Sequence, residues 1–221
     1  MSDAINTFLL VFAGLFPVVN PLGSAPIFLM LTTDCSVQER DRLAWAVARN
    51  GFWLLLGSVI FGSAILEFFG ITVPVVRLAG GIVVTLMGWR LLNDDRASPE
   101  REAINSAAQP LQTHDSFYPL TMPLTVGPGS ISVAITLGSH RPVADTASHM
   151  ALLAASAMVG LIAIAATVYV CYRFAERLAR ILGRSGINVL LRLSAFILMC
   201  IGIEIAWSGV KALLATVGQP A

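Results

Sequence analysis

The chain is poor in charge. Only 12% of its 221 residues are Asp, Glu, Lys or Arg, and the formal net charge is +1. Soluble domains carry about 25% charged residues, so this composition argues against a soluble globular domain. No basic patch interleaved with aromatic side chains is present, which argues against a nucleic-acid partner. HExxH, Walker and nucleophile-elbow motifs are also absent, and the chain is therefore not expected to be an enzyme.

Cysteine is scarce as well. Cys35, Cys171 and Cys200 make an odd count without the spacing of metal ligands. Cys171 and Cys200 lie in apolar stretches, so we expect them to pack as small buried hydrophobic residues. The sequence predicts no metal site and no cofactor. The N-terminus has Asp3 in place of the basic start of a secretory signal. The first apolar stretch is therefore expected to be retained.

Apolar residues, by contrast, make up 56% of the chain, and the mean hydropathy is +0.78. About 20 apolar residues cross a hydrocarbon core as a helix. Six segments reach this length, and they predict an all-α polytopic membrane protein with six transmembrane helices. The predicted spans are about 5–31, 43–69, 73–92, 117–138, 151–172 and 189–214. A polar stretch over about 93–116 is expected to be a cytoplasmic linker.

The placement of basic residues predicts the orientation. Eleven arginines fall in or beside the loops after the first, third and fifth spans, against three basic residues on the other side. The positive-inside rule places the richer side in the cytoplasm, so both termini are expected to be periplasmic. Arginines recur at helical spacing over 173–184, opposite an apolar face. This segment is expected to lie on the membrane surface as an amphipathic helix.

Two spans are interrupted by similar clusters of residues. The first reads Phe-Pro-Val-Val-Asn-Pro-Leu-Gly-Ser over 16–24, and the second reads Met-Pro-Leu-Thr-Val-Gly-Pro-Gly-Ser over 122–130. Aligned without gaps, they share three residues: Pro17 with Pro123, Gly23 with Gly129 and Ser24 with Ser130. Proline removes a helical N–H and glycine loosens the backbone. Helices 1 and 4 should therefore be broken in mid-span.

The third and sixth spans also resemble each other. Arg-Leu-Ala opens one at Arg77, Arg-Leu-Ser opens the other at Arg192, and with one gap Gly88 then matches Gly202. The repeat unit is thus three spans. Because three is odd, the second unit enters the membrane from the opposite side, which predicts two inverted three-helix repeats. They would cover about 5–92 and 117–214 of a single transmembrane domain, 1–221.

The two breaks are the candidate binding site. Unwound backbone inside a bilayer survives only where it is buried in protein or lines a cavity, and paired broken helices mark transporter sites. New half-helices are expected to start at Ser24 and Ser130, with N–H groups that favour an anionic group. The predicted solute-binding residues are Asn20, Pro21, Gly23, Ser24, Thr125, Gly127, Pro128, Gly129 and Ser130. The alternative is a pair of proline kinks that only shape the bundle.

Three ionisable residues in the spans are candidates for ion coupling or structure. Glu204, in the sixth span, is either a proton carrier or cation partner, or an acid beside a wet outer cavity. Arg77 and Arg192 occupy matched positions near span starts. They either snorkel to lipid headgroups or form a structural pair across the pseudo-axis.

Both clusters resemble signatures of a known family. Residues 15–26 and 119–131 closely resemble the two signatures of the MarC family, and segments 36–40 and 77–82 resemble it too. The resemblance covers nearly the whole chain. It implies a six-span bacterial inner-membrane protein of the LysE-type transporter group, some of whose members are associated with uptake of small neutral amino acids. Glu204 departs from the family pattern, in which a neutral amide is common.

The predicted function is a secondary transporter or exporter of a small neutral or zwitterionic solute, bound in mid-membrane between the breaks. Transport would be coupled to H⁺ or Na⁺, or uncoupled. The alternative is a non-transporting membrane scaffold or regulatory subunit, in which the breaks are packing joints. A polar cavity between the breaks would favour the transporter. Besides the solute, the expected partner is the lipid bilayer, and the sequence predicts no oligomeric state.

Overall fold

All regular elements in the described part of the chain are helices. The computed structural model describes residues 2–93, 115–139 and 147–217. The elements are α1 (Ser2–Val19), α2 (Pro21–Leu31), α3 (Val37–Phe68), α4 (Val73–Asn93), η1 (Ser116–Thr125), α6 (Pro128–Ser139), α7 (Ala147–Arg173) and α8 (Ala175–Val217). Most of the predicted linker, 94–114, lies outside the described residues.

The six predicted spans are present, and the first and fourth are broken as expected. Four helices, α3, α4, α7 and the part of α8 after residue 184, are long and apolar enough to cross a membrane. Two bent pairs make the other spans, α1 with α2 at 40° and η1 with α6 at 71°. Helices extend past the predicted apolar segments where polar caps allow it. At the start of α3, Ser36 and Glu39 form a reciprocal capping box.

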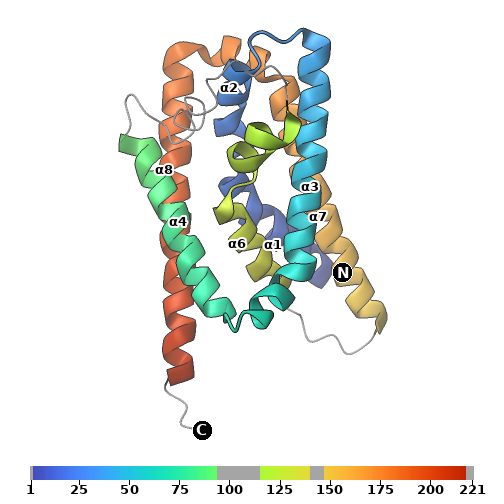
Figure 1. Ribbon diagram of the computed structural model, residues 1–221, viewed down its shortest axis with the longest axis vertical. Coiled ribbons are helices and arrows are strands. Elements are labelled where there is room, and N and C mark those ends of the chain that lie inside the picture. Colours follow the sequence, from blue (N-terminus) through green and yellow to red (C-terminus); the bar gives the residue numbers. More distant parts are fainter. Residues whose placement is uncertain (1, 94–114, 140–146, 218–221) are drawn as a thin grey trace.

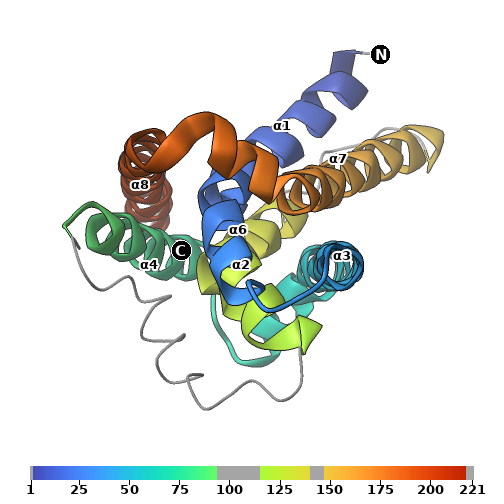
Figure 2. The ribbon, with the colours of Figure 1, turned by 90° about the horizontal axis from the view of Figure 1, so that it is seen from above.

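The two halves run in opposite directions. In Figure 1, α1–α2 and α4 run upward and α3 runs downward, whereas η1–α6 and α8 run downward and α7 runs upward. Seen from above, α4 and α8 lie on one side, α3 and α7 lie on the other, and α2 and α6 lie between them (Figure 2). This is the inverted arrangement that an odd number of spans per repeat predicts.

Glycines bring α4 and α8 into backbone contact. A Cβ atom added to Gly81 would lie 2.3 Å from the backbone nitrogen of Ala206. Added to Gly88, Gly202 or Gly209, it would lie 2.4 to 2.7 Å from a backbone nitrogen of the facing helix. Small residues of this kind allow two membrane helices to approach closely, so this pair forms a closely packed wall beside the broken helices.

One end of the bundle carries most of the described arginines. There the first part of α8 crosses the bundle before the helix turns at Gly183 (φ 61°), in the place expected for the amphipathic helix over 173–184 (Figure 2). Two ion pairs tie this corner to the start of α3, Arg40 with Glu176 and Arg173 with Asp41, each at 3.5 Å. We call this the arginine-rich end. The opposite end, where α1 begins and α8 ends, is the terminal end (Figure 1).

Candidate functional site

The first break is held by one residue, Asn20. Its backbone is left-handed (φ 47°), a conformation that asparagine tolerates better than most residues. Its side-chain oxygen accepts a hydrogen bond from the Gly23 N–H at 3.2 Å, and its carbonyl accepts one from the Ser24 hydroxyl at 2.9 Å. The prediction that the new helix starts at Ser24 is wrong, because α2 already begins at Pro21. Proline suits a first helical position, since the N–H it lacks would be unsatisfied there.

The second break is wider and less regular. Tyr118 and Met122 each precede a proline, and both have extended backbone angles inside η1. The proline ring disfavours helical angles in the residue before it, which explains both departures. η1 ends at Thr125, with Val126 as its C-cap, and α6 begins at Pro128. The expected start at Ser130 is therefore also wrong, for the same reason as at the first break.

A buried tyrosine supports the second break from a distance. The Tyr172 hydroxyl of α7 lies 2.7 Å from the Thr125 hydroxyl. Thr125 donates its own hydrogen to the Leu120 carbonyl at 2.7 Å, so Tyr172 is the donor in this pair. The Tyr172 ring also stacks on Phe28 of α2, with centroids 4.3 Å apart. Tyr172 therefore joins the two broken helices, a role that its position within an apolar span did not reveal.

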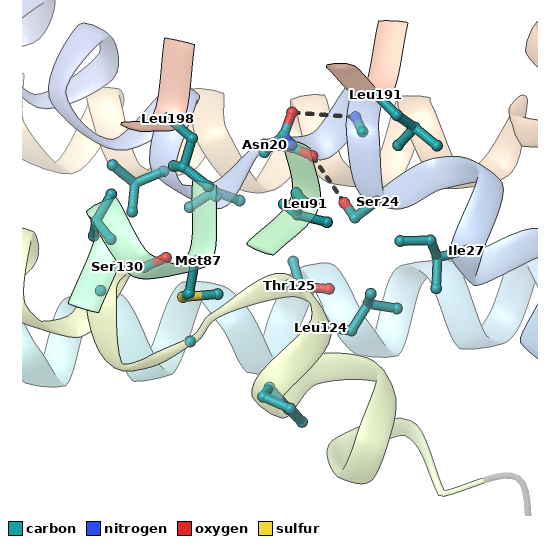
Figure 3. A pocket seen from close by; sticks show the side chains of 17 residues that line it. Asn20, Ser24, Ile27, Met87, Leu91, Leu124, Thr125, Ser130, Leu191 and Leu198 are labelled. Atoms are coloured by element: carbon teal, nitrogen blue, oxygen red, sulfur yellow. Dashed lines mark hydrogen bonds between the residues drawn. The ribbon is translucent and has the colours of Figure 1, made fainter. Parts of the chain in front are cut away.

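The two breaks border one cavity, shown in Figure 3. It is a small, partly open space bordered by the two breaks, α4 and α8. Seven of the nine predicted residues line it: Asn20, Gly23, Ser24, Thr125, Gly127, Gly129 and Ser130. The other two, Pro21 and Pro128, are not among its lining residues and begin α2 and α6. The expected approach of the two breaks from oppositely directed helices is thus present.

The remaining wall comes from α4 and α8 and was not predicted. Val84, Met87 and Leu91 lie on one face of α4, and Leu191 and Leu198 lie one heptad apart on α8. Their spacing is helical. The sequence did not predict this wall, however, because neighbouring positions on these spans are equally apolar and hydropathy does not distinguish the face that lines the cavity. Leu91 and Leu191 are near the arginine-rich end, so the cavity extends from the breaks toward that end.

The cavity offers hydrogen-bond donors and no charge. Ser130 is 2% exposed, its hydroxyl makes no hydrogen bond with any described residue, and it points into the cavity (Figure 3). It stands in the first turn of α6, where the backbone N–H groups have no partner within the helix. The Asn20 amide nitrogen is a further donor. Among the residues that line this cavity none is ionisable. Such a site suits hydrogen-bond acceptors, including a carboxylate at the helix start.

The other candidates lie away from the cavity. Arg77 is half-buried at the start of α4, whereas Arg192 and Glu204 are exposed on α8, and none of the three lines the cavity. In the register of Gly88 and Gly202, Glu204 matches Arg90, in the last turn of α4. Ser132, a further polar residue of the second cluster, donates to the Val76 carbonyl at 3.0 Å and so serves helix packing.

These features define the class of protein: a polytopic integral membrane protein whose two broken spans meet at an internal cavity. The sequence pattern described as "MarC family integral membrane protein" matches residues 5–214, and the chain belongs to this family. It is 28% identical to the inner membrane protein MarC of Salmonella paratyphi A over 220 residues, which cover 98% of this chain and 99% of that relative. The Escherichia coli MarC protein is 27% identical with the same coverage. No solved structure matches the chain.

Proposed function

We propose that this protein is an inner-membrane secondary transporter or exporter of a small neutral or zwitterionic solute. The observation that carries the proposal is the meeting of both broken helices at one cavity with uncharged polar groups. A packing joint does not need a hydroxyl that points into a cavity without a partner, because buried polar groups are normally hydrogen-bonded. The names of the relatives in Salmonella and Escherichia coli support the inner membrane as its location.

Within this proposal, the solute carboxylate binds at the start of α6. Ser130 donates its hydroxyl hydrogen, and the α6 backbone N–H groups and helix dipole add to the attraction. Gly129 lets α6 pack closely against α4 beside this site, since an added Cβ would lie 2.5 Å from Val84. A small zwitterion such as glycine or alanine fits these groups better than a charged amino acid, whose second charge would find no counterion among the lining residues.

The residues that line the cavity also indicate which ion could be coupled to transport. Because no carboxylate or imidazole lines the cavity, proton coupling would need a titratable group elsewhere. Carbonyl and hydroxyl oxygens at the breaks suit Na⁺ better, and an uncoupled carrier needs neither ion. Uptake into vesicles under an imposed Na⁺ gradient, an imposed pH gradient, or neither, separates the three cases.

A thermal-shift screen with neutral amino acids tests the function, followed by uptake into vesicles. We expect the unfolding temperature to rise with a bound solute and uptake to be saturable. Ser130→Ala should weaken binding about tenfold or more, since it removes a hydrogen bond to a charged group. Ser24→Ala is the matched control, because the Ser24 hydroxyl already donates to Asn20. If neither solute binding nor uptake is found with any small neutral metabolite, the scaffold or regulatory subunit becomes the better account.

The proposed orientation has both termini in the periplasm. The arginine-rich end gathers Arg40, Arg90, Arg173 and Arg177, whereas Arg77 and Lys211 lie toward the terminal end. Reporter enzymes fused after Ala221 test this orientation. We expect activity from a reporter that works only after export. Activity from a reporter that works only in the cytoplasm would reverse the assignment.

A further inference from the structure

Glu204 is an acidic residue on the outside of a membrane span. A Cβ added to Gly202 would lie 2.4 Å from the Thr85 nitrogen, and one added to Gly81 would lie 2.3 Å from the Ala206 nitrogen. Because Thr85 and Gly81 stand near the middle of α4, these contacts place Glu204 near the middle of the membrane span. Glu204 is exposed, and it has no hydrogen-bond or ion-pair partner among the described residues.

This position of Glu204 is unfavourable if only lipid covers it. Charged side chains in the hydrocarbon region are costly and usually have a polar partner. Helical side chains tilt toward the N-terminus of their helix, and α8 runs toward the terminal end. The Glu204 side chain therefore tilts toward the arginine-rich end and away from the membrane surface at which α8 ends. The Glu204 carboxylate thus calls for a partner within the membrane.

Glu204 belongs to a row of residues on α8 that faces away from α4. We call this row the outer stripe. Its six members are exposed and lie three or four residues apart: Leu193, Ile197, Cys200, Glu204, Trp207 and Lys211. Gly202 and Gly209, which contact α4, are on the opposite side of the helix. Figure 2 shows α8 at the edge of the bundle, and the spacing of the outer stripe is the one with which parallel helices pack side by side.

The outer stripe carries groups that complement Glu204. The Lys211 ammonium lies 5.6 Å from the centroid of the Trp207 ring, so the lysine side chain is directed back along the stripe toward Glu204. Seven residues, or about 10 Å of helix, separate Glu204 from Lys211, and no ion pair joins them within the described chain. The Trp207 indole N–H makes no hydrogen bond with any described residue. The stripe therefore has an unpaired acceptor, an unpaired donor and one charge of each sign.

We propose that the outer stripe is the interface with a second copy of this chain. Two copies inserted in the same direction are related by a two-fold axis along the membrane normal, so their α8 helices run parallel. In parallel heptad packing, a side chain inserts between residues of the facing helix that include the one three positions further along. Glu204 of each copy then accepts a hydrogen bond from the Trp207 indole of the other. Lys211 of the other copy follows one turn later, and its charge offsets the repulsion between the two Glu204 carboxylates.

Self-complementarity favours a second copy over an unrelated partner. A two-fold interface needs contacts that are reciprocal, so each copy must supply both members of every pair. The outer stripe does so, with Glu204 as the acceptor and Trp207 and Lys211 as the donors. The proposal concerns association between copies and does not depend on the proposed transport function.

Crosslinking through the native Cys200 tests the interface. Cys200 is free and exposed on the outer stripe, one turn before Glu204, and the other two cysteines, Cys35 and Cys171, would be replaced by alanine. Two differently tagged copies are produced together, and isolated membranes are treated with a short, lipid-soluble bifunctional thiol reagent. Val159→Cys in a chain without Cys200 is the matched control, because Val159 is 54% exposed near the middle of α7, on the other side of the bundle.

We expect Cys200 to give a product that contains both tags at least tenfold faster than position 159 does. Glu204→Leu should slow this reaction about three- to tenfold, because the polar contacts inside the membrane are lost. Trp207→Phe keeps the ring and removes the N–H, so it should slow the reaction about two- to fivefold, and it serves as the test if Glu204→Leu is not inserted. Glu67→Gln, at an exposed acid near the end of α3, should leave the rate unchanged.

Three results would overturn the proposal. Equal rates at Cys200 and at position 159 would mean that lipid covers the outer stripe. A product in which one tagged copy is joined to a different protein would mean an unrelated partner. An unchanged rate in Glu204→Leu, or in Trp207→Phe where that variant serves as the test, would mean that copies meet without the contacts proposed for Glu204.

Discussion

The two broken helices have matched proline, glycine and serine residues but keep their shapes by different means. The α1–α2 break bends by 40°, and the hydrogen bonds that Asn20 accepts from Gly23 and Ser24 hold it within one turn of chain. The η1–α6 break bends by 71° and has Val126 where the first has Asn20. Valine has no polar side-chain atom with which to cap a helix.

Tertiary contacts replace that cap at the second break. The Thr125 hydroxyl accepts a hydrogen bond from the Tyr172 hydroxyl of α7, and the Ser132 hydroxyl donates one to the Val76 carbonyl of α4. The comparison teaches that similar sequence clusters can share a role while only one of them specifies its own geometry. Mutations at the first break should act locally, whereas those at the second should act through its partners.

The largest effect is expected from Gly129→Leu at the second break. The new side chain would begin 2.5 Å from Val84, force α6 away from α4 and displace the neighbouring Ser130, so solute uptake should be lost. Uptake into vesicles measures the effect, and size-exclusion chromatography shows whether the protein is folded. Gly57→Leu in α3 should keep full uptake. Full uptake in Gly129→Leu would make the second break a packing joint.

Asn20→Ala should be the most destabilising change at the first break. Alanine must hold a left-handed backbone and cannot cap α2, which together lower the free energy of unfolding by about 2 kcal/mol. Asn20→Gly adopts the same backbone freely and should cost less than about 1 kcal/mol. Denaturant titration of the purified protein measures both. Equal losses in the two variants would show that the backbone conformation of Asn20 is not what holds this break.

Tyr172→Phe tests the distant support of the second break. It removes the hydrogen bond to Thr125 and keeps the ring stacked on Phe28, so it should lower the free energy of unfolding by about 1 kcal/mol. Combined with Thr125→Val, the loss should be less than additive, because both changes remove the same bond. Tyr118→Phe, at an exposed tyrosine of η1, is the control and should leave stability unchanged. An additive double variant would argue against the link.

The smallest effect is expected from Glu204→Gln. Glu204 is exposed on α8 and does not line the cavity, and its match in the first half is the cationic Arg90. Uptake should change by less than about twofold, with an unchanged pH profile. A fall in uptake of about tenfold or more would support a role for Glu204 in ion coupling. It would also mean that the second half carries a functional group that the first half lacks.

The spans, their breaks and their inverted order followed from local properties of the sequence. Apolar segments of membrane-spanning length predicted the six spans. Proline and glycine predicted that the first span breaks near Asn20–Pro21 and the fourth near Gly127–Pro128. The predicted starts of α2 at Ser24 and of α6 at Ser130 are wrong by a few residues, because proline and not serine occupies the first helical position. Seven residues of the cavity wall were predicted because they belong to the breaks themselves.

Tertiary structure decided the rest of the cavity wall and the support of the second break. In a membrane span nearly every face is apolar, so hydropathy does not say that Val84 and Leu198 face the cavity while their neighbours face outward. Nor does it say that Tyr172 meets Thr125, 47 residues away in sequence. Those contacts depend on how oppositely directed helices pack, and packing is set by the shapes of side chains that meet only after the chain has folded.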